Sequence, residues 1–244
     1  MTVSKTIPQL HLLKFARFLH PLLRLLYRRE YPSLQRECMG LHFSSPIGIA
    51  AGVDKRGEYT DVIACYSPSF VEIGPLRDVR YTIRNLKERS EDIVVLANVS
   101  NTPELERSFS LLYDFVDGFV LNVSKGSTVS RAIDHLLDLR RCNDEYKPIL
   151  FKIFPDLSGE ELDEVADFAL RSGIDGIMIA AEFLDFVRSA TLGLLPVIAI
   201  AEIAAPERAA QMLEAGADLI AVTNSPIHYG PALIPKILKY LDKQ

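Results

Sequence analysis

Short apolar runs alternate with amphipathic stretches along the chain from residue 47 to its end. The runs are rich in β-branched residues and apolar on both faces, as expected of strands buried in a parallel sheet. Eight such runs occur, at residues 47–51, 70–74, 93–98, 118–123, 149–153, 176–180, 197–200 and 219–223. Eight strand–helix units predict a closed (β/α)8 TIM barrel, and 244 residues is close to the usual size of one.

The stretches between the runs carry signals of helix ends. In GEELDEVADFALRSG, Ser158 is suited to be the N-cap and Gly173 the C-cap, and in APERAAQMLEAGA Pro206 lies near the first turn. No linker or low-complexity tract interrupts the pattern. We therefore expect one barrel over residues 41–244, preceded by a helical extension over residues 1–40.

The extension has an amphipathic pattern of its own. Its apolar residues recur at steps of three and four with a basic stripe between them: Leu12, Phe15, Leu19, Leu22 and Leu26 against Lys14, Arg17, Arg24 and Arg28. This predicts a basic amphipathic helix over residues 10–29, bent at Pro21. Such a helix either covers the open bottom of its own barrel or lies in the surface of an anionic membrane, and the pattern leaves both open.

Composition narrows the classes of partner. A net charge of −5 and a pI near 5.6 argue against nucleic acid, whose phosphates require a concentrated basic surface. The three cysteines form no CxxC pair and the five histidines show no HxxxH or HExxH spacing, so we expect a reduced protein without a metal site. Every window of 18 residues contains a charge, which predicts a cytoplasmic protein, peripheral on the inner face of the membrane if its helix binds lipid.

Candidate functional residues follow several of the predicted strands, where the active sites of such barrels lie. They are Ala51, Gly52, Asp54 and Lys55 after the first run, Asn98 in the third, Asn122 with Ser124 and Lys125 in and after the fourth, and Lys152 in the fifth. Lysine supplies charge and asparagine supplies a donor and an acceptor, which predicts a small, planar, anionic ligand. A single polar strand end is often only solvated, but Lys152 stands within an apolar strand and is interpreted as functional.

The last two predicted strands lack the glycines that commonly bind phosphate in such barrels. The seventh ends in AIAEIAAPE and the eighth in VTNSPIHYG, with Glu202 in the first of these turns and Glu182 after the sixth strand. A carboxylate about 4 Å from a phosphate charge costs roughly 4 kcal/mol at an effective dielectric near 20. We expect no phosphate site here, and we expect Glu202 or Glu182 to approach a lysine of the mouth or a backbone amide.

Six segments in collinear order carry a more specific signal. They are CMGLHFSSPIGIAAGVDKRGE (38–58), FVEIG (70–74), FVLNVS (119–124), ILFKIFPDLSGEEL (149–162), SGIDGIMI (172–179) and GPALIPKIL (230–238). Together they resemble dihydroorotate dehydrogenase, specifically its membrane-associated, quinone-reducing class. The resemblance implies an FMN-containing barrel that oxidises dihydroorotate to orotate, with a serine as the base.

Compared position by position with the family, part of the site is retained and part is changed. The resemblance implies flavin contacts at Ala51, Gly52, Asn98, Asn122 and Lys152, and substrate contacts at Lys55, Asn122 and Ser127. Lys125 occupies the position of the serine base. Other family positions are changed: Pro75 replaces a threonine, Ala180 and Ala181 replace Thr-Asn, Ala201 and Glu202 replace a glycine pair, and Thr223, Asn224 and Ser225 replace the phosphate turn. A substrate segment between the second and third strands is deleted.

Two functional hypotheses remain. A lysine acts as a general base where desolvation and neighbouring cations lower its pKa, and Lys55 and Lys152 could supply those cations for Lys125. Base and phosphate site have changed together, however, which favours a dihydroorotate dehydrogenase-like barrel that is non-catalytic or repurposed, acting through a partner or a small ligand. The alternative is an active FMN-dependent enzyme of pyrimidine biosynthesis. The sequence identifies neither an electron acceptor nor the oligomeric state.

Overall fold

The computed structural model describes residues 16–99, 104–123, 129–223, 229–230 and 232–244. Within them, eight parallel strands close into a barrel in the order β3-β4-β5-β6-β7-β8-β9-β10, with β10 pairing back to β3. The strands are β3 (Ile47–Ile49), β4 (Phe70–Ile73), β5 (Val94–Val99), β6 (Gly118–Val123), β7 (Ile149–Ile153), β8 (Gly176–Ala180), β9 (Val197–Ala201) and β10 (Leu219–Val222). The (β/α)8 prediction is confirmed, and each of the eight predicted runs overlaps one strand of the barrel.

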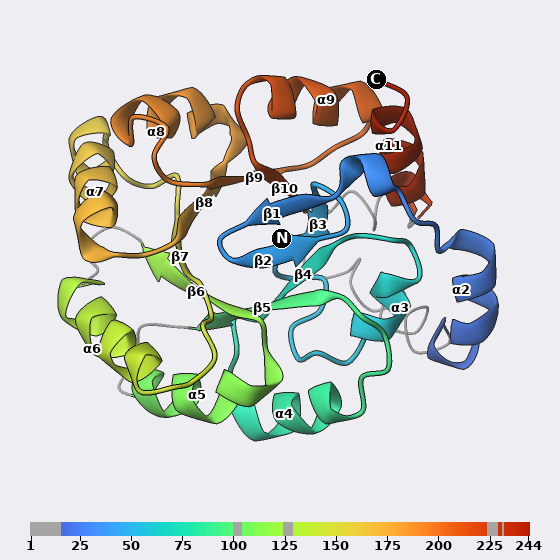
Figure 1. Ribbon diagram of the computed structural model, residues 1–244, viewed down its shortest axis with the longest axis horizontal. Coiled ribbons are helices and arrows are strands. Elements are labelled where there is room, and N and C mark those ends of the chain that lie inside the picture. The colour runs from blue at the N-terminus through green and yellow to red at the C-terminus, as the bar shows by residue number, and fades with distance from the viewer. Residues whose placement is uncertain (1–15, 100–103, 124–128, 224–228, 231) are drawn as a thin grey trace, which may run out of the picture.

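Helices surround the strands as an outer ring, as Figure 1 shows. They are α3 (Thr60–Ala64), α4 (Val79–Lys87), α5 (Leu105–Leu112) with the 3-10 turn η2 (Tyr113–Phe115), α6 (Val129–Arg141), α7 (Gly159–Ser172), η3 (Ala181–Phe183) with α8 (Leu184–Ala190), α9 (Pro206–Glu214) and α11 (Leu233–Leu241). The predicted ends of α7 are confirmed. Ser158 and Glu161 form a reciprocal capping box, and Gly173 ends the helix in the left-handed conformation at φ 81°.

A hairpin covers the bottom of the barrel, where the strands begin (Figure 1). It consists of β1 (Arg36–Cys38) and β2 (Leu41–Phe43), which pair antiparallel after the 3-10 turn η1 (Pro32–Leu34). The Phe43 ring meets the ring of Phe70, the first residue of β4, edge-on at 5.8 Å between centroids. Of the two alternatives left open for the N-terminal helix, a cover over the bottom of the barrel is supplied by this hairpin instead, and the hairpin turn contains residue 40, the expected boundary.

The interior of the barrel changes character toward its mouth. A buried apolar cluster that includes Phe70, Leu96, Val120, Leu150, Met178 and Ile198 fills the lower part. Side chains alternate between the two faces of a strand, so the residues two positions further along these strands also point inward. On β4 to β7 these are Glu72, Asn98, Asn122 and Lys152, here called the polar half-layer; on β8 and β9 they are Ala180 and Ile200. At this level of the rim, β4 to β7 are thus polar, and β8 and β9 are apolar.

The N-terminal segment lies outside the barrel, beside α3 (Figure 1). Residues 16–18 are helical, Leu19 is in a turn, and α2 (His20–Tyr27) begins directly after it. Pro21 stands in the first turn of α2, where a missing N–H costs nothing, so the predicted bend is a break just before the proline. No helix of the described residues is long and apolar enough to cross a bilayer.

Candidate functional site

Glu72 is the centre of the polar half-layer. Its side chain is fully buried, and its carboxylate accepts four hydrogen bonds from three donor groups. Lys152 Nζ lies 2.9 Å from Oε1 and 2.8 Å from Oε2, Asn98 Nδ2 donates to Oε1 at 2.6 Å, and the N–H of Ala51 donates to Oε2 at 2.8 Å. A buried charge is tolerated when it is paired and fully hydrogen-bonded, and both conditions are met here.

The two asparagines complete the network by bonding to each other. Asn98 Nδ2 donates to Asn122 Oδ1 at 3.0 Å, and Asn122 Nδ2 donates back to Asn98 Oδ1 at 2.9 Å. The register of β6 and β7 places Asn122 directly beside Lys152. The structure thus brings together Asn98, Asn122 and Lys152, as the sequence predicted, and shows them bonded within the barrel wall.

Glu72 is the residue of this network that the sequence reasoning did not use. The signal was present, because a carboxylate inside the apolar run FVEIG is as unusual as the lysine inside ILFKI. Two opposite charges at inward positions of one barrel predict a pair. We expected an anionic ligand because Lys152 was taken as a positive charge without a partner. Glu72 supplies that partner.

The loop after β3 is shaped by a second buried carboxylate. Asp54 accepts the backbone N–H groups of Arg56, Glu58 and Tyr59 at 3.2, 3.0 and 2.8 Å. Burial raises the pKa of Asp54 above its ordinary value, and these hydrogen bonds oppose the shift. The loop carries Gly52, at φ 107° with open space where a side chain would begin, and Lys55, which is exposed.

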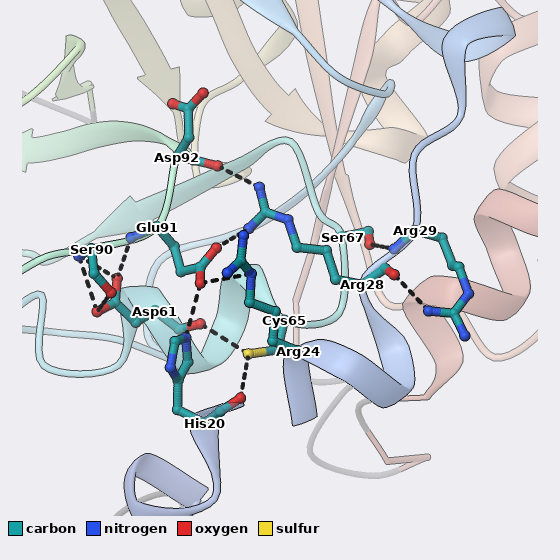
Figure 2. A network of polar contacts seen from close by, with 10 residues as sticks. All are labelled: His20, Arg24, Arg28, Arg29, Asp61, Cys65, Ser67, Ser90, Glu91 and Asp92. Carbon is teal, nitrogen blue, oxygen red and sulfur yellow. Dashed lines mark hydrogen bonds and ion pairs between the residues drawn. The ribbon is translucent and has the colours of Figure 1, made fainter. Parts of the chain in front are cut away.

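A different cluster holds α2 against the barrel. Glu91, in the loop between α4 and β5, has a side chain that is 5% exposed. Arg28 Nη1 lies 2.5 Å from Glu91 Oε2, Arg24 Nε lies 3.2 Å from Oε1, and His20 Nε2 lies 3.2 Å from Oε1 without hydrogen-bond geometry. Figure 2 shows these three side chains converging on Glu91, and we call the four residues the docking cluster.

The loop that carries Glu91 is itself fixed to α3. The carboxylate of Asp61 accepts the backbone N–H groups of Ser90 and Glu91 at 3.0 to 3.2 Å (Figure 2). Beneath α2, Cys65 Sγ donates to the backbone oxygens of Asp61 at 3.3 Å and His20 at 3.7 Å. Burial first, and then the nearby Glu91 carboxylate, raise the pKa of the Cys65 thiol to about 11.

The apolar face of the N-terminal segment points away from the barrel. Phe18 is 86% exposed and Leu25 is 75% exposed, Leu22 and Leu26 are about half exposed, and α2 buries none of its residues. Arg24 and Arg28, half of the predicted basic stripe, face Glu91 instead. Lys14 lies outside the described residues.

Comparison with proteins of known sequence agrees with the family resemblance of the motifs. No family model matches it. A dihydroorotate dehydrogenase (quinone) of Vibrio atlanticus (strain LGP32) is 25% identical over 313 aligned positions that cover 93% of each chain. One from Coxiella burnetii (strain Dugway 5J108-111) is 25% identical over 297 positions, covering 87% of this chain and 86% of that one. Both alignments exceed 244 residues, so the relatives have segments that this chain lacks. The chain is a shortened, divergent relative of the dihydroorotate dehydrogenases.

Solved structures show the same fold. The ligand-free dihydroorotate dehydrogenase of Eimeria tenella superposes with a TM-score of 0.79 at 20% identity, covering 94% of this chain and 92% of that one. The complex of the Eimeria tenella protein with ferulenol gives 0.76 at 19% identity, covering 92% and 90%. The likeness extends over almost the whole barrel.

The sequence resemblance assigns a phosphate corner to the segments after β9 and β10, and part of this corner is described. There β9 ends at Ala201, followed by the exposed Glu202, and the N–H of Thr223 bonds to the Ala201 oxygen at 2.9 Å. Helix α9 then begins with Pro206, which has no N–H, and carries Glu207 in its first turn. Neither residue suits an anion at a helix N-terminus.

Several residues that the resemblance assigns to the site lie outside the described part of the chain. Lys125 and Ser127 lie outside the described residues, as do Asn224 and Ser225 of the phosphate turn. The roles implied for them stay predictions. Lys152 pairs with Glu72, and Glu182 and Glu202 are both exposed. The expectation that one of these two glutamates approaches a lysine of the mouth or a backbone amide stays a prediction. Within the described part of the chain, no group of three metal-ligating side chains occurs.

Proposed function

We propose that this chain is a dihydroorotate dehydrogenase-like barrel that no longer oxidises dihydroorotate and instead binds a small ligand without a phosphate group at its mouth. The observation that supports this most is the polar half-layer. The family resemblance assigns Asn98, Asn122 and Lys152 to flavin contacts. Here the two asparagines are bonded to each other, and Asn98 and Lys152 are both bonded to Glu72. A flavin would have to compete with these bonds.

The phosphate corner supports the same proposal. Binding of FMN in such barrels relies on backbone amides that face the phosphate. Here the chain offers Glu202 and a helix that begins with Pro206 and Glu207. A carboxylate about 4 Å from the phosphate would cost roughly 4 kcal/mol at an effective dielectric near 20, which is about half the free energy of micromolar binding.

One observation favours the alternative, an active flavoenzyme. Asn98, Asn122 and Lys152 remain inward at the carboxyl ends of consecutive strands. In that case Asn98, Asn122 and Lys152 would contact the flavin ring, Lys55 would contact the substrate, and Lys125 would accept the substrate proton. FMN supplies the hydride acceptor in such enzymes.

Titration of FMN, followed by flavin fluorescence, separates the two functions. We expect the protein to purify colourless and to bind FMN more weakly than about 1 μM, a free energy of roughly −8 kcal/mol. Glu202→Gly should tighten binding, because it removes a repulsive charge and frees backbone amides. Glu164→Gln, an exposed charge change on the outer helix α7, is the matched control and should leave it unchanged. One FMN per purified chain, with oxidation of dihydroorotate, would overturn the proposal.

A further inference from the structure

Each of the three histidines in the described part of the chain faces a glutamate. In the hairpin, His42 Nδ1 lies 2.7 Å from Glu37 Oε1. Between α6 and α5, His135 Nδ1 lies 2.6 Å from Glu106 Oε1. All four of these side chains are more than half exposed. An ion pair in such a position contributes little to stability, so protonation of either histidine has little effect on the fold.

The third histidine, His20 of α2, faces a carboxylate that is buried. Its Nε2 lies 3.2 Å from Glu91 Oε1, and the Glu91 side chain is 5% exposed (Figure 2). Within the described residues, this Nε2 is buried and has no hydrogen-bond partner. A neutral ring leaves the nitrogen unsatisfied, whereas a protonated ring places a positive charge beside the carboxylate, where burial weakens the screening by water. The position of His20 therefore favours the protonated ring when α2 is attached.

The surroundings of His20 contain cations as well as carboxylates, and a cavity of about 180 Å³ borders it. The charged and titratable groups are Arg17, Arg24 and Arg28 of the N-terminal segment, Glu58, Asp61 and Cys65 in and around α3, and Glu88, Arg89 and Glu91 at and after the end of α4. Four arginines and four carboxylates balance, so the direct contact with Glu91 decides the effect of the proton. Carboxylates and arginines ordinarily keep their charges between about pH 6 and 8, and the Cys65 thiol, with its pKa of about 11, stays protonated. Histidine is the group of this set that changes its charge in that range.

We propose that His20 is a pH-sensitive lock on α2: the protonated ring fastens the helix to Glu91, and loss of the proton loosens it. The attached helix binds the proton more tightly than the released helix does. Attachment is therefore favoured at low pH and weakens as the pH rises through the range in which histidine titrates. Arg24 and Arg28 still bind Glu91 after the proton is lost, so the change is a graded weakening. The lock lies on the outer wall and is independent of the function proposed for the mouth.

Hydrogen exchange of the backbone amides, read by mass spectrometry, tests the lock on the full chain. The intrinsic exchange rate at each pH, divided by the measured rate of the α2 amides, gives the protection of the helix. We expect this protection to be at least about fivefold higher at pH 6 than at pH 8. His20→Gln removes the titrating ring and should bring the two values together. His135→Gln is the matched control, because it removes an exposed histidine–glutamate contact, and it should keep the fivefold difference.

Helix α7, on the other side of the barrel from α2, is the internal reference (Figure 1). Its protection should be the same at both pH values, and a change in α7 as large as that in α2 would overturn the proposal, because the whole fold would then respond. Glu91→Gln removes the other half of the contact and should also abolish the pH difference, which covers the case in which His20→Gln does not fold. Equal protection of α2 at pH 6 and pH 8 in the unmodified protein, or a difference that persists in either folded variant, would equally overturn it.

Discussion

Two buried glutamates serve different purposes in this molecule. Glu72 lies inside the barrel, and its cationic partner Lys152 comes from another strand of the same closed sheet. Glu91 lies at the outer wall, and its partners His20, Arg24 and Arg28 all come from one short helix. The chemistry of the two sites is similar, but the strands around Glu72 are also paired along their backbones in a closed sheet. Helix α2 buries none of its residues and is attached by its cluster, by the Tyr27–Tyr66 ring contact and by the bond from the Arg29 N–H to Ser67 Oγ. The first pair adjusts a rigid site, and the second holds a separate element in place.

The largest effect is expected from breaking the inner pair. Glu72→Gln leaves the buried Lys152 charge without its counter-charge, and should lower the free energy of unfolding by about 3–5 kcal/mol. Urea unfolding followed by circular dichroism measures it. The double substitution Glu72→Gln, Lys152→Met should recover most of the loss, because no unpaired charge then remains. A single substitution as stable as the unmodified protein would show that the pair contributes little.

Breaking the outer cluster should release α2 without unfolding the barrel. With Glu91→Gln we expect the midpoint of urea unfolding to change little, while tryptic cleavage after Arg24 and Arg28 becomes about tenfold faster, in line with the roughly 1.5–3 kcal/mol of a hydrogen bond to a charged group. Glu88→Gln is the control, because Glu88 is exposed and pairs with Arg84, which precedes it by one helical turn. Equal cleavage rates in both variants would mean that α2 is held by other contacts.

The rate at which Cys65 reacts with a thiol reagent should also show the release of α2 from the barrel. At pH 8, below its raised pKa of about 11, the thiol is almost entirely protonated, and α2 lies over it. Glu91→Gln should increase its rate of reaction with a thiol reagent several-fold, because departure of α2 reduces burial and removes the negative charge that raises the pKa. The comparison is made in a Cys142→Ser background, since Cys142 is exposed. A Cys65 rate that is the same with and without Glu91 would contradict the prediction.

The smallest expected effect is on the binding of the protein to lipid vesicles. One of the two alternatives from the sequence was a helix that lies on an anionic membrane through its basic stripe. In the structure Arg24 and Arg28 face Glu91, while Phe18, Leu22 and Leu25 face outward. We therefore expect any binding to anionic vesicles to fall about fivefold with Leu25→Ser and to respond only weakly to salt between about 0.1 and 0.5 M. Co-sedimentation measures it, with Leu192→Ser as the control, an exposed leucine of the loop between α8 and β9. Binding that is unaffected by Leu25→Ser or by removal of residues 1–32 would exclude this helix as the lipid contact.

The barrel was predictable from the sequence because its strands are buried on both faces. Apolar runs such as ILFKI and GFVLNV strongly indicate buried parallel strands. The carboxyl ends of such strands lie at one rim of a barrel. The gathering of Asn98, Asn122 and Lys152 followed from that rule alone. Their mutual bonding did not, because the inward direction of Glu72 and the distance across the barrel depend on the register of four strands.

The N-terminal part was predicted less well, for a different reason. An amphipathic pattern defines two faces but does not say which of them contacts the protein. The usual rule buries the apolar face, and here the buried carboxylate of Glu91, far along the chain, attracts the basic face instead. The hairpin at residues 36–43 was missed because its strands have three residues each, too short for a visible alternation.

The hairpin at residues 36–43 also limits the route by which a ligand can reach the barrel. Phe43 packs against Phe70 at the strand origins, and the apolar cluster fills the lower interior, so the barrel is closed at that end. A small ligand of the proposed function would therefore enter and leave at the carboxyl ends of the strands. Two ligands of that one site would exclude each other, whatever their chemistry.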